Sequence, residues 1–171
     1  MKNCTRIILV ISLLLCLLAC TQKTDNVYVE KDGTKYEVTQ QVSFYYPKDF
    51  SMDASSTDTN AISFIKDQEV IIYSMIPDDT DNKVEDMPDL YEGQLEEDGA
   101  TDVGYKNVEV DSGLICQEFT GVFESNGIKF KDVVYFRQDA AFVLRYKAPE
   151  KVYNENIENI SKFLNSIIVH E

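Results

Sequence analysis

A cysteine near the N-terminus carries the clearest chemistry in this sequence. Leu17-Leu18-Ala19-Cys20 closes a leader in which Lys2 and Arg6 precede an apolar run. A small residue followed by cysteine is the pattern that a lipoprotein signal peptidase reads before it leaves a diacylglyceryl-cysteine as the new first residue. The pattern therefore predicts that the Cys20 thiol is lipidated and that the rest of the chain is a tethered domain.

The length of the leader argues against a membrane-spanning helix. Residues 7–19 form an apolar run of 13 residues interrupted by Ser12, which fits the apolar core of a signal peptide. A spanning helix needs about 20 such residues. Cleavage after Ala19 without lipidation is the second alternative, and it fits less well because Leu-x-Ala-Cys is the lipoprotein form. Each CH₂ of an acyl chain on Cys20 would contribute about 0.8 kcal/mol to membrane binding.

Histidine and cysteine, which serve in many catalytic and zinc sites, are scarce. His170 is the only histidine and lies one residue from the end of the sequence, so a catalytic triad or a zinc site has little to draw on. Cys4 and Cys16 leave with the leader, so Cys116 is the only cysteine in the domain and an internal disulfide is excluded. Cys116 is either a thiol activated by a cation or, more commonly, a filler of a half-buried strand.

An acidic loop at residues 78–82 is the candidate metal site. It offers oxygen ligands from Asp78, Asp79, Asp81 and Asn82, the type that Ca²⁺ prefers. The spacing lacks the glycine and the distal glutamate of an EF-hand, and a solvated loop is the competing interpretation. Asp53 and Asp58 are weaker candidates. Among 30 acidic residues no carboxylate pair stands out for acid–base hydrolysis.

Length and charge indicate one acidic domain. Residues 1–19 are the predicted leader, residues 20–26 the lipidated N-terminus and tether, and residues 27–171 a single domain. Loss of Lys2 and Arg6 with the leader leaves 14 basic residues against 30 acidic ones, a net charge of −16. Such a surface repels nucleic acid and anionic lipid head groups. Solubility is the simpler explanation of the same charge.

Alternating apolar residues predict a largely β domain. The predicted strands span residues 27–30, 34–38, 42–46, 61–66, 70–76 and 103–110. Asp32-Gly33 is typical of a type I′ turn and predicts an opening hairpin. The strand at 70–76 is apolar on both sides, which places it in the middle of a sheet that is covered on both faces. Residues 88–97 favour a helix that depends on packing, because Gly93 weakens it by about 1 kcal/mol.

A second hairpin is predicted within residues 114–137. Asn126-Gly127 is a strong signal for a two-residue turn, and such a turn places Phe123 opposite Phe130 and Cys116 opposite Arg137. Residues 142–148 form a further antiparallel strand. Keeping its apolar side on the same face as the hairpin core requires a loop of odd length near Asp139, because a one-residue slip would bury Arg145.

Pro149 opens the last predicted element, an amphipathic helix. Its apolar stripe recurs at spacings of four and three residues and consists of Tyr153, Ile157, Ile160, Leu164 and Ile167. Pro149 and Glu150 suit a helix N-terminus. The helix is expected to lie across the antiparallel sheet.

Three segments resemble the PsbP-like fold, which is named for an extrinsic photosystem II subunit and is shared with a Ran-binding nuclear transport factor and many bacterial lipoproteins. They are the aromatic strand Phe44-Tyr45-Tyr46-Pro47-Lys48-Asp49-Phe50, the late strand at residues 142–148 and the helix end at 163–167. The resemblance implies an α+β fold with an antiparallel sheet of about six to eight strands, sandwiched by helices in α/β/α layers, and a C-terminal amphipathic helix. The usual Ser-Phe ending is Ser166-Ile167 here.

The sequence favours a binding role over catalysis. The lipobox and the PsbP-like order of elements lead us to expect a lipid-anchored extracytoplasmic accessory module that binds a protein or an envelope component. It would use an acidic face, on which Tyr28, Tyr36 and Tyr45 are the candidate outward tyrosines. The alternative is a lipoprotein that binds Ca²⁺ or a small ligand at residues 78–82. No cofactor and no nucleic acid partner is expected.

Overall fold

An antiparallel sheet forms the central layer of the molecule. The computed structural model describes residues 24–38, 41–55, 60–78, 80 and 82–170. Seven strands make up the sheet, in the spatial order β3 (Ser51–Met52), β4 (Ala61–Lys66), β5 (Glu69–Pro77), β9 (Ala140–Pro149), β8 (Ile128–Arg137), β7 (Ile115–Phe123) and β6 (Ala100–Glu109). The predicted fold class, including the strand number, is confirmed.

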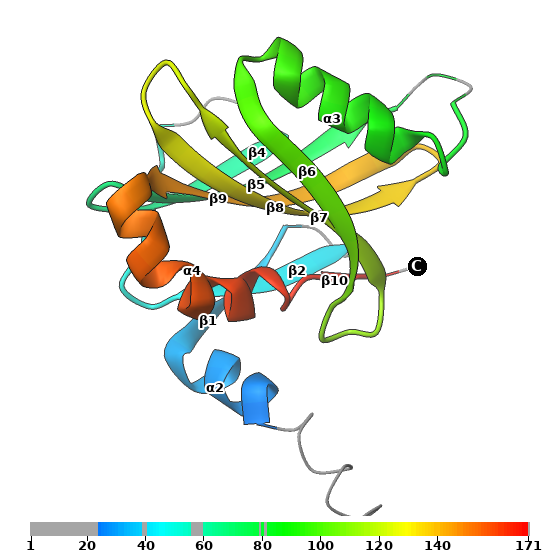
Figure 1. Ribbon diagram of the computed structural model, residues 1–171. Helices are drawn as coiled ribbons and strands as arrows, with labels where there is room; N and C mark the ends of the chain where they lie inside the picture. The colour runs from blue at the N-terminus through cyan, green and yellow to red at the C-terminus, as the bar shows by residue number, and fades with distance from the viewer. Residues whose placement is uncertain (1–23, 39–40, 56–59, 79, 81, 171) are drawn as a thin grey trace, which may run out of the picture.

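Both faces of this sheet are covered (Figure 1). One face carries α3 (Met87–Glu97). The other carries α4 (Glu150–Leu164) and a three-stranded sheet of β1 (Gly33–Glu37), β2 (Val42–Pro47) and β10 (Ile168–Val169). α2 (Thr24–Asp32) packs on β1 and β2, on the side away from the main sheet. Among the described residues, no helix combines the length and the apolar character needed to cross a membrane.

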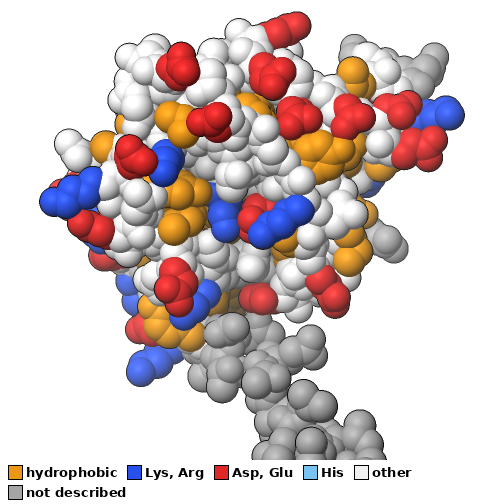
Figure 2. Space-filling view, in the orientation of Figure 1, with side chains coloured by type: hydrophobic (Ala, Val, Ile, Leu, Met, Phe, Trp, Pro, Cys, Tyr) orange, Lys and Arg blue, Asp and Glu red, His pale blue; other side chains and the backbone are white. Residues whose placement is uncertain are grey.

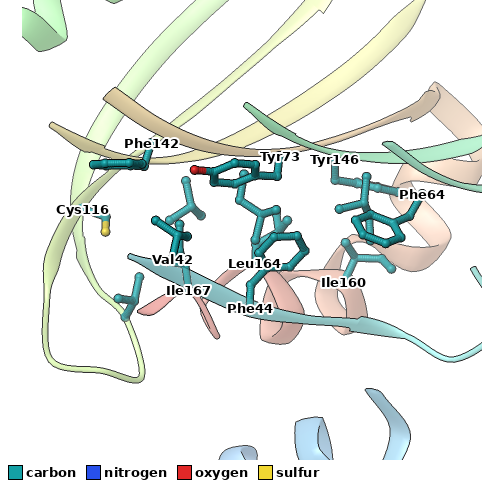
Figure 3. Packing of buried hydrophobic residues seen from close by; sticks show 14 of the residues in the cluster. Val42, Phe44, Phe64, Tyr73, Cys116, Phe142, Tyr146, Ile160, Leu164 and Ile167 are labelled. Atoms are coloured by element: carbon teal, nitrogen blue, oxygen red, sulfur yellow. The ribbon is translucent and has the colours of Figure 1, made fainter. Parts of the chain in front are cut away.

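Two apolar clusters, one on each face, hold the layers together. The larger lies between the main sheet, β2 and α4 (Figure 3), where Phe44 of β2 and Leu164 of α4 point toward Tyr73 and Phe142 of the sheet. The smaller lies under α3 and joins Met87 and Leu95 to the sheet. Its sheet members include Phe119, Phe130, Val134, Phe136 and Val143. The sheet is therefore apolar on both sides.

The two-sided pattern of β5 is explained by its central position. β5 pairs with β4 on one edge and with β9 on the other. Ile71 and Tyr73 point into the larger cluster, whereas Ile72 and Ile76 face the α3 side. The prediction of an inner strand covered on both faces is confirmed.

The prediction that the domain opens with a hairpin is wrong. Residues 27–30 belong to α2, and β1 pairs with β2 instead, with Gly33 opposite Pro47. The glycine of Asp32-Gly33 allows a close approach of the backbone, because a Cβ on Gly33 would lie 2.5 Å from the Val29 carbonyl oxygen. The dipeptide marks a junction between a helix and a strand. α2 begins at Thr24 and so includes the last three residues of the predicted tether.

The Asn126-Gly127 hairpin forms, but its register differs from the prediction by two residues. Phe123 pairs with Ile128 across a four-residue loop, and the carbonyl of Phe123 accepts hydrogen bonds from the N–H groups of Asn126 and Gly127. The Asn126 side chain accepts from the Ile128 N–H, and Gly127 has φ 64°. A shift of two residues leaves every side chain on its predicted face. Local hydrogen bonds at the turn therefore decide the register.

The prediction that the loop before β9 has an odd length is also wrong. Arg137 pairs with Ala140, so the loop holds two residues, and Arg145 faces Asp132. The prediction assumed that only one face of the strand is buried. Because α3 covers the second face, the even loop places one apolar side of β9 in each cluster. Arg145 then enters the α3 side of the sheet.

The C-terminal helix follows its predicted stripe. Tyr153, Ile160 and Leu164 are buried, and α4 packs on β9, β8 and β2. Phe163, which lies off the stripe, is buried as well, and its ring contacts Tyr28 of α2 at 6.1 Å between centroids. The chain then adds β10 to the edge of β2, an element that the sequence pattern did not predict.

Two glycine substitutions test this packing. A Cβ on Gly121 would lie 2.8 Å from ring atoms of the buried Phe130, whereas one on Gly93 in α3 would meet nothing within 4 Å. We expect Gly121→Ala to lower the free energy of unfolding by about 1–3 kcal/mol through overpacking. Gly93→Ala is the control and is expected to raise it by about 0.5–1 kcal/mol. Urea unfolding of both variants measures the difference, and equal effects would contradict the close contact at Gly121.

Candidate functional site: the groove between α3 and the sheet

An apolar groove lies between α3 and the β5 side of the main sheet. α3 packs beside β6 at the edge of the sheet, and its buried side chains meet β7, β8 and β9. The part of the face nearer β5 is left open, with a cavity of about 340 Å³ along the helix. Its apolar lining comes mainly from Ile72, Ile76, Leu90, Leu95, Ala141 and Val143. We call this space the α3 groove.

The lip of the α3 groove exposes large apolar side chains. Leu90 is 52% exposed and Ile76 is 44% exposed, and both line the cavity. Val84, in the turn before α3, is 38% exposed. The volume lies within the range of about 300–1,000 Å³ that is typical of ligand pockets. The combination of a pocket of this size with exposed apolar side chains makes the α3 groove the candidate binding site.

A buried ion pair forms part of the groove wall. Asp132 of β8 is fully buried and accepts two hydrogen bonds from Arg145 of β9, from Nε at 2.7 Å and from an Nη atom at 2.6 Å. The Tyr91 hydroxyl of α3 donates to the same carboxylate at 2.7 Å and accepts from Arg145 at 3.2 Å. The guanidinium also lies 5.1 Å from the centroid of the Phe130 ring. These contacts fasten α3 to the middle of the sheet.

The electrostatics of this cluster keep all its donors protonated. Burial opposes the charge of Arg145, but the hydrogen bonds and the charge of Asp132 more than offset that effect and raise the pKa of the guanidinium. Burial, reinforced by the charge of Asp132, raises the pKa of the Tyr91 phenol. Neither group therefore serves as a base near neutral pH. The arrangement suits binding and positioning rather than proton transfer.

Acidic side chains surround the groove. Asp78, after β5, and Asp98, at the C-terminal end of α3, line it directly. The outer side of α3 and the turn before it add exposed carboxylates from Glu85, Asp86, Asp89, Glu96 and Glu97. Figure 2 shows acidic side chains gathered over α3. Because Arg145 is paired with Asp132, the groove presents an apolar floor within a negative rim.

Several predicted site residues lie outside the described part of the chain. Cys20, Asp58, Asp79 and Asp81 all belong to this group. The carboxylate of Asp78 accepts hydrogen bonds from the backbone and side chain of Thr80, and these bonds lower its pKa. Among the described residues, no group of three acidic, histidine or cysteine side chains is arranged to hold a metal. Calcium binding at residues 78–82 stays a prediction.

Cys116 is a filler of the core. It is fully buried in the larger cluster, where it pairs with Val108 of β6. Burial raises the pKa of its thiol to about 11. Arg137, its predicted activator, pairs with Asp139 instead. The interpretation of Cys116 as a reactive thiol is wrong. The alternative, a residue that fills a half-buried strand, is right except that the Cys116 side chain is fully buried.

The three candidate tyrosines lie away from the α3 groove, on α2, β1 and β2. Tyr36 packs against Phe44 and Phe64 in the larger cluster, so the prediction that it faces outward is wrong. Tyr28 and Tyr45 are half-buried. The tyrosine at the groove is Tyr91, which the sequence pattern assigned only to an apolar helix face. The sequence feature that could have indicated the role of Tyr91 is the pair of opposite charges, Asp132 and Arg145, within two largely apolar strands.

Comparison with known proteins identifies the fold. No protein-family model matches the chain, and no curated protein sequence matches it. Solved structures do match. The Ran-binding protein Mog1p of Saccharomyces cerevisiae is similar with a TM-score of 0.54 and 12% identity, covering 80% of this chain and 95% of that one.

Two further structures extend the comparison. Cyanobacterial PsbP from Synechocystis gives a TM-score of 0.55 at 12% identity and covers 81% of this chain and 93% of that one. LpqN, described as involved in cell envelope biogenesis of Mycobacterium tuberculosis, gives 0.53 at 13% identity and covers 84% and 95%. The chain therefore has a PsbP/Mog1-like fold, and the expected resemblance is confirmed at that level.

The buried ion pair makes a testable contribution to stability. Arg145→Met leaves the fully buried Asp132 with Tyr91 as its hydrogen-bond partner and is expected to cost about 3–5 kcal/mol, whereas Asp132→Leu/Arg145→Met removes both charges and should cost far less. Arg137→Met, in the exposed pair with Asp139, is the control and should cost less than about 1 kcal/mol. Urea unfolding of these variants together with Asp132→Leu alone completes the double-mutant cycle. Additive losses in the double variant would refute a coupled pair.

Proposed function

We propose that this protein is a lipid-anchored binding module on the outer side of the cell membrane, and that it engages a protein partner at the α3 groove without catalysis. The observation that carries the proposal is the groove itself. It combines a cavity of about 340 Å³ with exposed Leu90 and Ile76 at its lip. Such exposed apolar surface is stabilised when a partner covers it.

The chemistry of the groove favours binding over turnover. Arg145 and Tyr91 donate hydrogen bonds to Asp132, and both stay protonated because their pKa values are raised. Two proteins of similar fold point in the same direction by their descriptions, since one is a Ran-binding protein and another takes part in cell envelope biogenesis. At 12–13% identity these descriptions support the proposal only by analogy.

The position of the proposed anchor suits this role. Cys20 precedes α2 by a few residues, and α2 lies on the opposite side of the molecule from α3 (Figure 1). An acylated Cys20 would therefore hold the membrane-facing side near α2 and leave the α3 groove directed away from the bilayer. The exposed carboxylates on α3 and in the turn before it favour the same orientation, because anionic head groups repel them.

Replacement of the lipidated cysteine tests the anchor. We expect Cys20→Ser to move the protein from the membrane fraction to the soluble fraction and to abolish incorporation of labelled palmitate, because the acyl chains supply the membrane affinity. Cys116→Ser is the control and should leave both unchanged. Membrane fractionation of the Cys20→Ser protein that matches wild type would contradict the proposed anchor.

Site-specific cross-linking tests the groove. A photoreactive amino acid at Leu90 should capture one reproducible protein in intact cells, because Leu90 projects from the lip of the groove. The same amino acid at the exposed Asn159 of α4, on the other side of the sheet, should not capture it. Identical cross-links from both positions, or a hydrolytic turnover by the purified protein, would overturn the proposal.

A further inference from the structure

We infer that the α3 groove accepts a cationic amphipathic segment of a protein, in which apolar anchor side chains are flanked by lysine or arginine. The inference deepens the proposed function and rests on it, since it assigns the chemistry of the partner at the same site. Three features carry it: the apolar floor, the negative rim and the orientation relative to the proposed anchor.

The apolar floor has the length of a short helical segment. α3 has 11 residues, which corresponds to about 16 Å, and it borders the cavity from Met87 to Asp98. β5 supplies the opposite wall with Ile72 and Ile76, which lie on one face of the strand with Ser74 between them. Leu90 and Ile76 continue the apolar surface beyond the cavity. A segment laid along this floor would insert anchors at helical spacing, as in other helix-in-groove complexes.

The rim determines the charge of the segment. Asp78 and Asp98 line the cavity, and further exposed carboxylates lie on α3, of which Asp89 faces β6 and accepts a hydrogen bond from Tyr105. Arg145, the cation in the lining, is held by two hydrogen bonds to Asp132. Lys83, in the turn before α3, lies 3.5 Å from Glu85. The potential over the groove is therefore negative, which favours a positive partner and speeds its encounter.

The orientation of the domain favours a protein over the bilayer as the occupant. α2, which follows the proposed lipid site, and α3 lie on opposite sides of the molecule (Figure 1). Acyl chains of the membrane that carries the anchor are thus on the far side. The acidic rim would in addition repel anionic lipid head groups. A basic segment of a protein satisfies both the floor and the rim.

A matched pair of peptides tests this chemistry. One is a helical peptide of about 16 residues with leucine anchors and lysine flanks, and the other carries glutamate in place of every lysine. We expect the lysine peptide to bind the full-length lipoprotein at least about tenfold more tightly. Its affinity should fall as salt rises from about 50 to about 500 mM. Hydrogen exchange should slow in α3 and β5.

Variants separate the groove from the general acidity of the protein. Leu90→Gln and Asp78→Asn/Asp98→Asn should weaken the lysine peptide severalfold. Glu155→Gln/Glu158→Gln, an equal change in charge on the exposed side of α4, is the control and should leave its affinity unchanged. Equal losses in both double variants, equal affinity for both peptides, or occupation of the groove by a long-chain acyl probe but by neither peptide would overturn the inference.

The outcome also distinguishes this inference from the proposed function. If the photoreactive residue at position 90 captures a partner while the lysine peptide shows no preference, the assigned chemistry is wrong and the binding role stands. If position 90 captures no partner and neither peptide binds, both are overturned. Self-association through the groove, seen as a dimer that Leu90→Gln abolishes, would identify a second copy as the occupant and likewise overturn the inference.

Discussion

The buried ion pair between Asp132 and Arg145 determines how α3 sits on the sheet. Asp132 is fully buried and Arg145 partly buried on a largely apolar part of the sheet face, and their burial is tolerated because the two charges are joined by two hydrogen bonds. Tyr91 adds a donor from α3. This bond ties the helix, which packs beside β6, to β8, and the β5 side of the face stays open. The groove is therefore the space left by a helix that is fixed elsewhere.

The opposite face is joined to its cover in a similar way. Glu69 of β5 is buried and accepts hydrogen bonds from the Tyr146 hydroxyl of β9 and from the Asn156 amide of α4. Lys131 of β8 donates to Ser161 of α4. Apolar contacts between layers are not directional, so these polar contacts specify where each helix lies. Each cover of this two-sided sheet is thus joined to it by polar contacts as well as by an apolar cluster.

The sequence predicts the elements of this fold better than their register. The apolar stripe of α4 reflects burial on a single face, and the run of apolar residues in β5 reflects burial on both, so the sequence was sufficient to predict these two elements. The predicted length of the loop before β9 was wrong because β9 is buried on both faces. That property depends on α3, which covers the second face, rather than on the strand itself. The hairpin at Asn126 forms as predicted, but its predicted register was wrong because hydrogen bonds to the Phe123 carbonyl favour a longer loop. The α3 groove could not be predicted from the sequence, because it depends on how α3 packs on the sheet. The charged residues Asp132 and Arg145 within apolar strands were the sequence feature that marked its position.

The two ends of the molecule differ in what they carry. The proposed lipid site adjoins α2, whereas the exposed apolar lip and the carboxylates lie at α3 on the other side. An acyl chain on Cys20 would attach the membrane close to the α2 end of the domain, because Cys20 precedes α2 by a few residues. The distribution of charge would favour the same orientation. In the proposed arrangement, repulsion between the acidic domain and anionic head groups would act within a Debye length of about 8 Å. The exposed carboxylates of α3 would add to that repulsion on their side of the molecule, which favours an orientation with the α3 groove away from the bilayer.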